Sequence, residues 1–294
     1  MVRFLNGLVA IGFLAAGSLA QLKDRINYPS GLGPSFDPGL NERTEDHIAE
    51  LDPWGRGWIP QGCKDRFISK GYQASDAEVF NVKYDDCDRA WTFCRHKDSQ
   101  LSIGQMVNKF GRLPIHMRSL VRHPIALPQA DCSAEAYTGL GDIVMYGPCT
   151  ALTVWIHEVG HQLDSRLNPV NRFSASNDWL QALAADSCVP DSYANFNAIE
   201  DFAQVAVVSQ FNTILGYKPD GQFPGCFDHQ HGLLEHNFRA NYLEKGGSCD
   251  NRPADSPPVS MNPTKRDVMA VIKWDNDTEL DDPSVIRCNF SATQ

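Results

Sequence analysis

The sequence predicts an α+β domain in which a mixed β-sheet packs on a central helix and disulfides stabilise the fold. The run 143–146, Ile-Val-Met-Tyr between two glycines, is short and β-rich, as is typical of a strand. Three longer segments, 150–167, 177–185 and 197–215, have helical patterns, and an Asn-Pro pair ends the first. Nine cysteines can supply the cross-links. We find no repeat or linker, so one domain is the simplest account.

The first twenty residues differ from the rest of the chain. Arg3 precedes an almost wholly apolar or small stretch, Leu5 to Leu19, and the small residues Ser18 and Ala20 flank its end. This pattern is typical of a secretory signal peptide that is cleaved after Ala20. A transmembrane anchor is the alternative, but the stretch is short for a span and ends in a cleavage-like site. We therefore expect residues 1–20 to be a signal peptide and the mature protein to be secreted and extracellular.

Composition agrees with an extracellular location. The formal net charge is −10, and loss of the signal peptide removes only Arg3, which makes it −11. The absence of a dense Lys/Arg run disfavours nucleic acid and anionic membranes as partners, and the oligomeric state stays open. In an oxidising compartment most of the nine cysteines should pair, and an odd number leaves at least one over. Sequons at Asn276 and Asn289 predict a glycoprotein.

Three regions follow from this interpretation. Residues 1–20 are the signal peptide, residues 21–62 are expected to form an extended arm or short pro-segment, and residues 63–294 form the folded domain. The arm is rich in Gly, Pro and Asp and shows no sustained period. Within the domain we also expect a helix over 103–110, a short strand over 120–123 and a last regular element of uncertain type over 268–274.

The segment His157-Glu-Val-Gly-His161 has the spacing of a zinc site on a helix. Positions four apart lie one turn above each other, so both imidazoles share one face and can bind a tetrahedral zinc. Glu158 is rotated away from the metal but can take a proton from a water bound there. Gly160 adds no side chain beside the ligands, at a helix cost of about 1 kcal/mol. The alternative is an amphipathic helix with two surface histidines, but this helix is too apolar all round for the surface.

A catalytic zinc needs a third protein ligand. The metzincin pattern is excluded because Asp164 and Leu167 stand where it would place glycine and histidine. Asp164 shares the histidine face, although its place near the helix end favours support of a ligand or of backbone. Glu200, near the start of the 197–215 helix, is the better candidate. Its alternative role is a capping box with Asn197, three residues earlier.

A family resemblance enters at these residues. HEVGHxxD followed by Tyr193-Ala and by Glu200-Asp-Phe-Ala resembles the catalytic domain of the anthrax lethal factor family, among the gluzincins. The resemblance covers about residues 143 to 208 and implies a zincin-like fold. It implies that His157, His161 and Glu200 bind Zn²⁺, that Glu158 is the base, and that Tyr193 faces the metal-bound oxygen. The whole chain also resembles secreted fungal conidiation-specific proteins, which implies a location rather than a chemistry.

Other histidines compete for a metal. His229 and His231 form an HxH pair, a spacing that metals can use on a strand. A solvated polar loop beside Cys226 is the better interpretation of that stretch. His96 and His236 have no partner by spacing.

The sequence thus predicts a zinc-dependent endopeptidase that hydrolyses a protein or peptide substrate. Glu158 moves the proton, Tyr193 donates to the developing oxyanion, and strand 143–146 lines the cleft, where an extended peptide pairs with its edge. The alternative interpretation of Tyr193 is a packed aromatic side chain without a catalytic role. One alternative is a non-catalytic zinc-binding structural or wall-associated protein on the same fold. A zinc hydrolase acting on a non-peptide bond is another.

Overall fold

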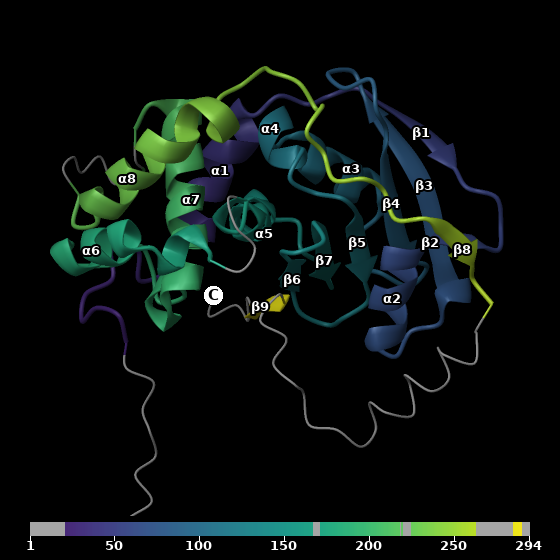
Figure 1. Ribbon diagram of the computed structural model, residues 1–294, viewed down its shortest axis with the longest axis horizontal. Coiled ribbons are helices and arrows are strands. Elements are labelled where there is room, and N and C mark those ends of the chain that lie inside the picture. Colours follow the sequence, from purple (N-terminus) through teal and green to yellow (C-terminus); the bar gives the residue numbers. More distant parts are fainter. Residues whose placement is uncertain (1–20, 167–170, 218, 220–224, 263–284, 290–294) are drawn as a thin grey trace, which may run out of the picture.

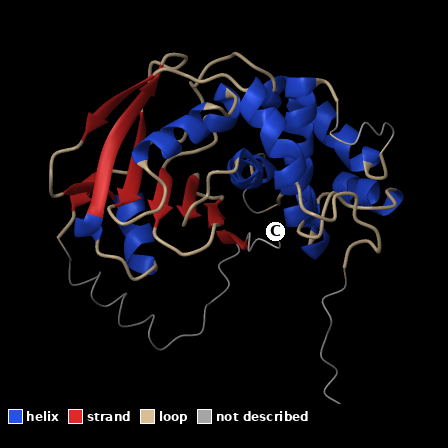
Figure 2. Ribbon diagram, turned by 180° about the vertical axis from the view of Figure 1, so that it is seen from behind, coloured by secondary structure: helices blue, strands red, loops and turns tan. Residues whose placement is uncertain are grey.

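The molecule has a sheet-rich half and a helical half. The computed structural model describes residues 21–166, 171–217, 219, 225–262 and 285–289. Figure 2 shows the strands gathered on one side and most helices on the other. The long helix α5 lies between the sheet and the helical half (Figure 1). None of the described helices is long and apolar enough to cross a membrane.

A seven-stranded mixed sheet forms the first half. Its strands, in spatial order, are β1 (Ala49–Pro53), β3 (Ala77–Tyr84), β4 (Trp91–His96), β5 (Pro124–Leu127), β7 (Asp142–Tyr146), β6 (Ser133–Tyr137) and β9 (Val285–Asn289). The β4–β5 and β5–β7 pairs are parallel and the other four are antiparallel. A separate two-stranded sheet pairs β2 (Trp58–Pro60) with β8 (Pro258–Ser260). The α+β class with a mixed sheet is confirmed.

Eight α-helices are present among the described residues. They are α1 (Gly33–Arg43), α2 (Gln61–Ser69), α3 (Ile103–Gly111), α4 (Ile115–Arg118), α5 (Leu152–Asp164), α6 (Asn177–Ala185), α7 (Ala198–Leu215) and α8 (Asp228–Phe238). Short helical turns add η1 (Ala74–Asp76), η2 (Phe173–Ala175), η3 (Ala194–Phe196) and η4 (Arg239–Leu243). The helices expected over 103–110, 150–167, 177–185 and 197–215 correspond to α3, α5, α6 and α7.

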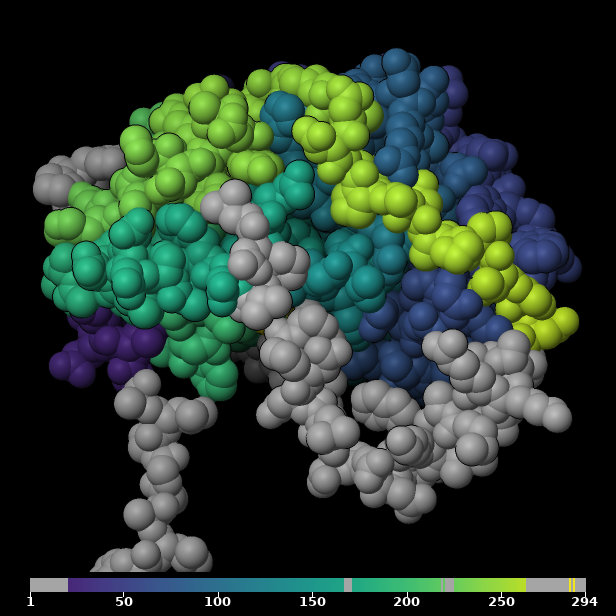
Figure 3. Space-filling model, in the orientation of Figure 1, coloured from purple at the N-terminus to yellow at the C-terminus, as the bar shows by residue number. Residues whose placement is uncertain are grey.

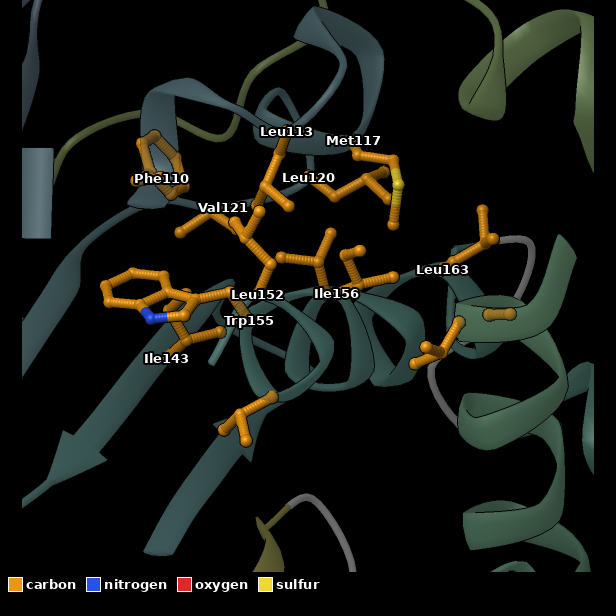
Figure 4. Packing of buried hydrophobic residues seen from close by; sticks show 14 of the residues in the cluster. Phe110, Leu113, Met117, Leu120, Val121, Ile143, Leu152, Trp155, Ile156 and Leu163 are labelled. Atoms are coloured by element: carbon orange, nitrogen blue, oxygen red, sulfur yellow. The ribbon is translucent and has the colours of Figure 1, made fainter. Parts of the chain in front are cut away.

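Side chains alternate between two buried faces of the sheet. On β7, Ile143 and Met145 belong to the core that contains α5, whereas Val144 belongs to the core that contains α2. Every residue of α5 is buried, which explains why this helix is apolar all round. Figure 4 shows Leu152 and Ile156 pointing from α5 toward the residues that follow α3, and both are at most 1% exposed. Helix α5 is therefore held from several sides, and its face toward α7 is fixed.

Residues 21–62 differ from the expected extended arm. They contain α1, which packs on α5 and α7, and β1, which is the far edge of the main sheet. Phe36 and Leu40 of α1 are fully buried. The sequence hid this helix because Gly33, Pro34, Pro38 and Gly39 dilute its periodicity. Pro34 stands at the helix start, where a missing N–H costs little, whereas Pro38 lies inside the helix.

Two further expectations need correction. The segment 120–123 is not a strand but a turn that leads into β5. Strand β7 forms as expected over 143–146 but is not at an edge, because β5 and β6 flank it. Strand β6 follows β7 toward the edge of the sheet, and β9, which pairs with β6, is the edge strand. The expected element over 268–274 and the signal peptide over 1–20 lie outside the described residues.

Four disulfides form and leave one cysteine over, as the odd number required. The bridges are Cys63–Cys94, Cys87–Cys249, Cys132–Cys149 and Cys188–Cys226. All nine cysteines lie in the described residues, and Cys288 is free and buried. The Cys87–Cys249 bridge ties the sheet to the chain that leaves the helical half. Figure 3 shows that chain, in yellow-green, crossing the surface toward β8.

We expect the Cys87–Cys249 bridge to stabilise the fold more than the Cys132–Cys149 bridge. Their sequence separations are 162 and 17 residues. From the loss of loop-closure entropy in the unfolded chain we expect the first bridge to stabilise the fold by about 5 kcal/mol and the second by about 3 kcal/mol. Replacing each pair by alanines and measuring denaturant unfolding of both variants tests this order. An equal loss in the two variants would show that chain entropy does not govern these bridges.

Candidate metal centre

Helix α5 presents two imidazoles to one point in the interior, which we call the metal point. His157 and His161 lie one turn apart, their ring centroids are 4.5 Å apart, and both side chains are fully buried. The structure thus contradicts the alternative of two surface histidines. Glu158 is fully buried beside them.

Helix α7 brings Glu200 to the same point. Asn197 caps this helix, since its side-chain oxygen accepts hydrogen bonds from the backbone N–H groups of Ile199 and Glu200. The Glu200 side chain turns instead toward α5. Its Oε2 lies 3.1 Å from Nε2 of His157 and 3.3 Å from Nε2 of His161. The capping assignment therefore holds for Asn197, and Glu200 is free to act as a ligand.

The two helices approach closely because Gly160 has no side chain. A Cβ built on Gly160 would lie 3.2 Å from Cα and 3.4 Å from Cβ of Ala203 on α7. That spacing is tighter than an ordinary van der Waals contact. The glycine on α5 and the small residue on α7 therefore set the distance between the histidines and Glu200.

A fourth side chain, Cys288 of β9, completes the cluster. Its Sγ lies 3.2 Å from Nε2 of His157, 3.5 Å from Nε2 of His161 and 3.8 Å from Oε2 of Glu200. The four potential ligand atoms lie within 4.8 Å of one another, and all four side chains are buried. Sequence reasoning missed Cys288, although the odd cysteine number gave a signal that one thiol had another use.

The donor set and its spacing fit a tetrahedral zinc ion. Zinc binds imidazole and carboxylate at about 2.0–2.1 Å and thiolate at about 2.3 Å, so neighbouring ligand atoms should be about 3.3–3.6 Å apart. The five separations given above span 3.1 to 3.8 Å. Imidazole, carboxylate and thiolate are also the groups that zinc prefers. The residues present therefore fit the ion that the helix motif predicts.

A hydrogen-bond chain orients His157. Its Nδ1 lies 3.1 Å from Oε1 of Gln204, and the Gln204 side-chain amide donates to Asp191 at 2.7 Å. The other carboxylate oxygen of Asp191 accepts from the backbone N–H groups of Tyr193 and Ala194. Such outer partners fix the ring of a metal-ligating histidine. The same carboxylate thereby positions both His157 and the backbone at Tyr193.

The two predicted catalytic groups border the cluster. The Tyr193 ring packs edge-on against the His157 ring, with the two centroids 5.4 Å apart. Glu158 has the Cys288 thiol as its neighbour and no other hydrogen-bond partner among the described residues. The Tyr193 hydroxyl also lies within hydrogen-bonding reach of that thiol. The thiol is thus surrounded by five side chains, which belong to His157, Glu158, His161, Tyr193 and Glu200.

Burial dominates the electrostatics of the site. It raises the pKa of Glu158 to about 8 and lowers the pKa of His161 to about 4. Burial also opposes ionisation of Glu200, but the histidines prevail and lower the pKa of this carboxyl. Burial raises the pKa of the Tyr193 phenol and that of the Cys288 thiol. A neutral His161 and an ionised Glu200 are the forms that bind a cation.

Asp164 does not join the cluster. Its two carboxylate oxygens accept from the backbone N–H and the hydroxyl of Ser174, both at 2.7 Å. This is the supporting role expected from its position near the end of α5. The aspartate holds the η2 turn against α5.

The competing histidines occupy other environments. His229 and His231 lie on α8 rather than on a strand or loop, and residues two apart on a helix point in different directions. His229 pairs with Asp186 at 2.7 Å. His96 is 5% exposed and packs beside Tyr72. The HxH spacing therefore does not form a metal site here.

Comparison with known proteins assigns the family. The family model described as Conidiation-specific protein Con-13 matches residues 37–280. The chain belongs to the Con-13 family. Conidiation-specific protein 13 of the fungus Neurospora crassa is 30% identical to this Con-13 family member over 249 residues, which cover 80% of this chain and 72% of that protein. No solved structure matches the chain significantly.

The matched region has a defined relation to the cluster. It contains His157, Glu158, His161, Tyr193 and Glu200 and ends before Cys288. Neither match bears on the resemblance of the core to the lethal factor family.

Gly160→Ala in this Con-13 family member should weaken zinc binding although alanine is the better helix former. The helix gain is about 1 kcal/mol, but the new methyl meets Ala203 and separates α5 from α7. We expect zinc affinity to fall about 10–100-fold, as when a group that orients a metal ligand is lost. Competition with a chromophoric chelator measures it.

Gly232→Ala is the matched control for that variant. Gly232 lies inside α8, and a Cβ there would meet nothing within 4 Å. This change should stabilise the fold slightly and leave zinc affinity unaltered. Equal zinc affinities in the two variants would contradict the role given to the close contact.

Removal of Glu200 should weaken zinc binding more than removal of Asp164. Wild type should bind close to one zinc per chain. Loss of an outer partner lowers metal affinity about 10–100-fold. Glu200→Ala should lower the zinc affinity further than that, because a ligand is lost. Asp164→Ala should keep the metal but unfold more easily, since each orphaned Ser174 group costs about 1–3 kcal/mol. A metal-free Asp164 variant beside a loaded Glu200 variant would show that the third ligand is misassigned.

Proposed function

We propose that this Con-13 family member is a secreted zinc-dependent endopeptidase on a zincin-like fold. The convergence of His157, His161 and Glu200 on one buried point carries the proposal. The resemblance of the core to the lethal factor family and the apolar N-terminal stretch support it. The substrate class is protein or peptide, and the acidic composition gives no support to nucleic acid or membrane binding.

The chemistry divides among the residues at the site. Zinc, when bound, would polarise a substrate carbonyl and make a water molecule more acidic. Glu158 would take the proton from that water and return it to the leaving nitrogen, acting as general base and then general acid. Tyr193 would donate its hydroxyl to the carbonyl oxygen as negative charge develops there. The Gln204–Asp191 chain would keep His157 in one orientation throughout.

The sheet offers a place for an extended substrate. Strand β6 borders α5, so a peptide that pairs with β6 would pass beside the histidines. Main-chain hydrogen bonds to a strand bind many sequences alike, which suits a peptidase that acts on unfolded segments. In the described structure β9 holds this position.

One observation favours a second candidate function. Catalytic zinc sites usually have three protein ligands, whereas structural sites are closed by four. Cys288 gives this cluster a fourth potential ligand. A non-catalytic, wall-associated protein in which zinc stabilises the fold would have such a set.

The proposed endopeptidase predicts opposite effects of Glu158→Gln on binding and on turnover. Glutamine keeps the shape but cannot accept the proton, so zinc should stay while casein hydrolysis falls about 10²–10⁴-fold. Tyr193→Phe should lower kcat about 10²–10³-fold with KM little changed, since its contact strengthens only in the transition state. Both are measured at matched zinc content.

Because the Cys288 thiol lies at the metal point, Glu158→Gln and Tyr193→Phe are each also combined with Cys288→Ala in one protein. If no form that binds zinc hydrolyses casein or a panel of denatured proteins, the endopeptidase is rejected and the structural candidate is adopted. A Tyr193→Phe variant with full turnover would make this residue a packed aromatic.

A further inference from the structure

The Cys288 thiol is unlike an ordinary buried cysteine. A free cysteine in a core usually behaves as a small apolar side chain among others. Cys288 is 1% exposed, yet its sulfur contacts two imidazoles and the carboxylate of Glu200. It is also the one cysteine of nine outside a disulfide. Both facts have one explanation if the sulfur is held by the same ion as the other three side chains.

Strand pairing directs this thiol to the metal point. In the antiparallel β6–β9 pair, Cys288 lies opposite Ala134 and Ile286 lies opposite Ala136. Residues opposite one another project from the same face of a sheet. Ala134 and Ala136 belong to the core that contains α5, so Cys288 faces α5 as well. The register of five residue pairs therefore aims the sulfur at His157 and His161.

The same strand closes the route for a substrate. Strand β9 pairs with β6 at the sheet edge, where an extended peptide would bind. His157, Glu158 and His161 are fully buried, and Glu200 is 4% exposed. Neither water nor a peptide carbonyl can reach Glu158 while β9 stays in this position. The described arrangement is thus a closed form of the site.

We propose that Cys288 is a fourth zinc ligand and that β9 is a built-in inhibitory strand that keeps the enzyme latent. This inference rests on the proposed zinc endopeptidase. On binding, the thiol releases its proton to solvent and the thiolate closes the site. When β9 leaves β6, the thiolate takes up a proton, and the vacated position and the strand edge become available to water and substrate. No oxidant or further reactant is needed.

Cobalt substitution of the full chain tests the ligand directly. Co²⁺ bound by a thiolate absorbs in the near ultraviolet through charge transfer from sulfur, whereas nitrogen and oxygen ligands give no such band. Wild type should bind one Co²⁺ and show the band. Cys288→Ala and Cys288→Ser should still bind Co²⁺ through the other three side chains but lack the band.

Hydrolysis of casein by the zinc-loaded proteins tests latency. Wild type should be nearly silent, and Cys288→Ala should be about 10–100-fold more active if the closed form outnumbers the open form by that ratio. Ile286→Val is the matched control, because it alters a buried β9 side chain on the same face without removing sulfur. It should keep the cobalt band and remain close to wild type in activity. Thermal unfolding of each variant verifies that it is folded.

The outcomes separate this inference from the proposed function. If wild type binds no metal, the metal centre fails and the inference fails with it. If metal binds without a sulfur band, Cys288 is not a ligand and the inference is overturned while the endopeptidase stands. A sulfur band together with an inactive Cys288→Ala protein overturns latency, because the four-ligand site is then structural.

Discussion

The close approach of α5 and α7 at Gly160 and Ala203 is the constraint on which the site depends. It brings Glu200 within 3.1 Å of His157 across two helices that are separate in sequence. The cost of glycine within a helix, about 1 kcal/mol, is offset by packing that a larger residue would prevent. The hydrogen bond between His157 and Gln204 crosses between the same two helices and depends on the same spacing.

The cluster concentrates ionisable groups in the protein interior. Two imidazoles, two carboxyl groups, a phenol and a thiol meet there, and burial raises the pKa values of Glu158, Tyr193 and Cys288 and lowers that of His161. Isolated buried charges are costly, so groups of this kind are normally paired or bind metals. The Gln204–Asp191 chain satisfies only the outer side of His157. A divalent cation at the inner point would satisfy the remaining donors together, and this is the physical ground for a metal centre in a Con-13 family member.

The fold was predictable where the pattern was local. Helix α6 has the bounds that its sequence predicts, and α7 begins one residue later because Asn197 is its cap. Helix α1 escaped prediction because its stability comes from burying Phe36 and Leu40, not from its own periodicity. Strand β7 formed as expected, but its central place depends on β6 folding back beside it, which no local signal encodes.

The sequence by itself determined the helix that bears His157 and His161, since a spacing of four residues puts two side chains on one helical face whatever surrounds them. It also determined that at least one of the nine cysteines has no partner within the chain. Only the tertiary structure decided which cysteine that is and what surrounds it. Cys288 is 127 residues from His161 in sequence, and their contact follows from the β6–β9 register and from the packing of the sheet on α5. Contacts of that range arise from packing, which periodicity and spacing do not record.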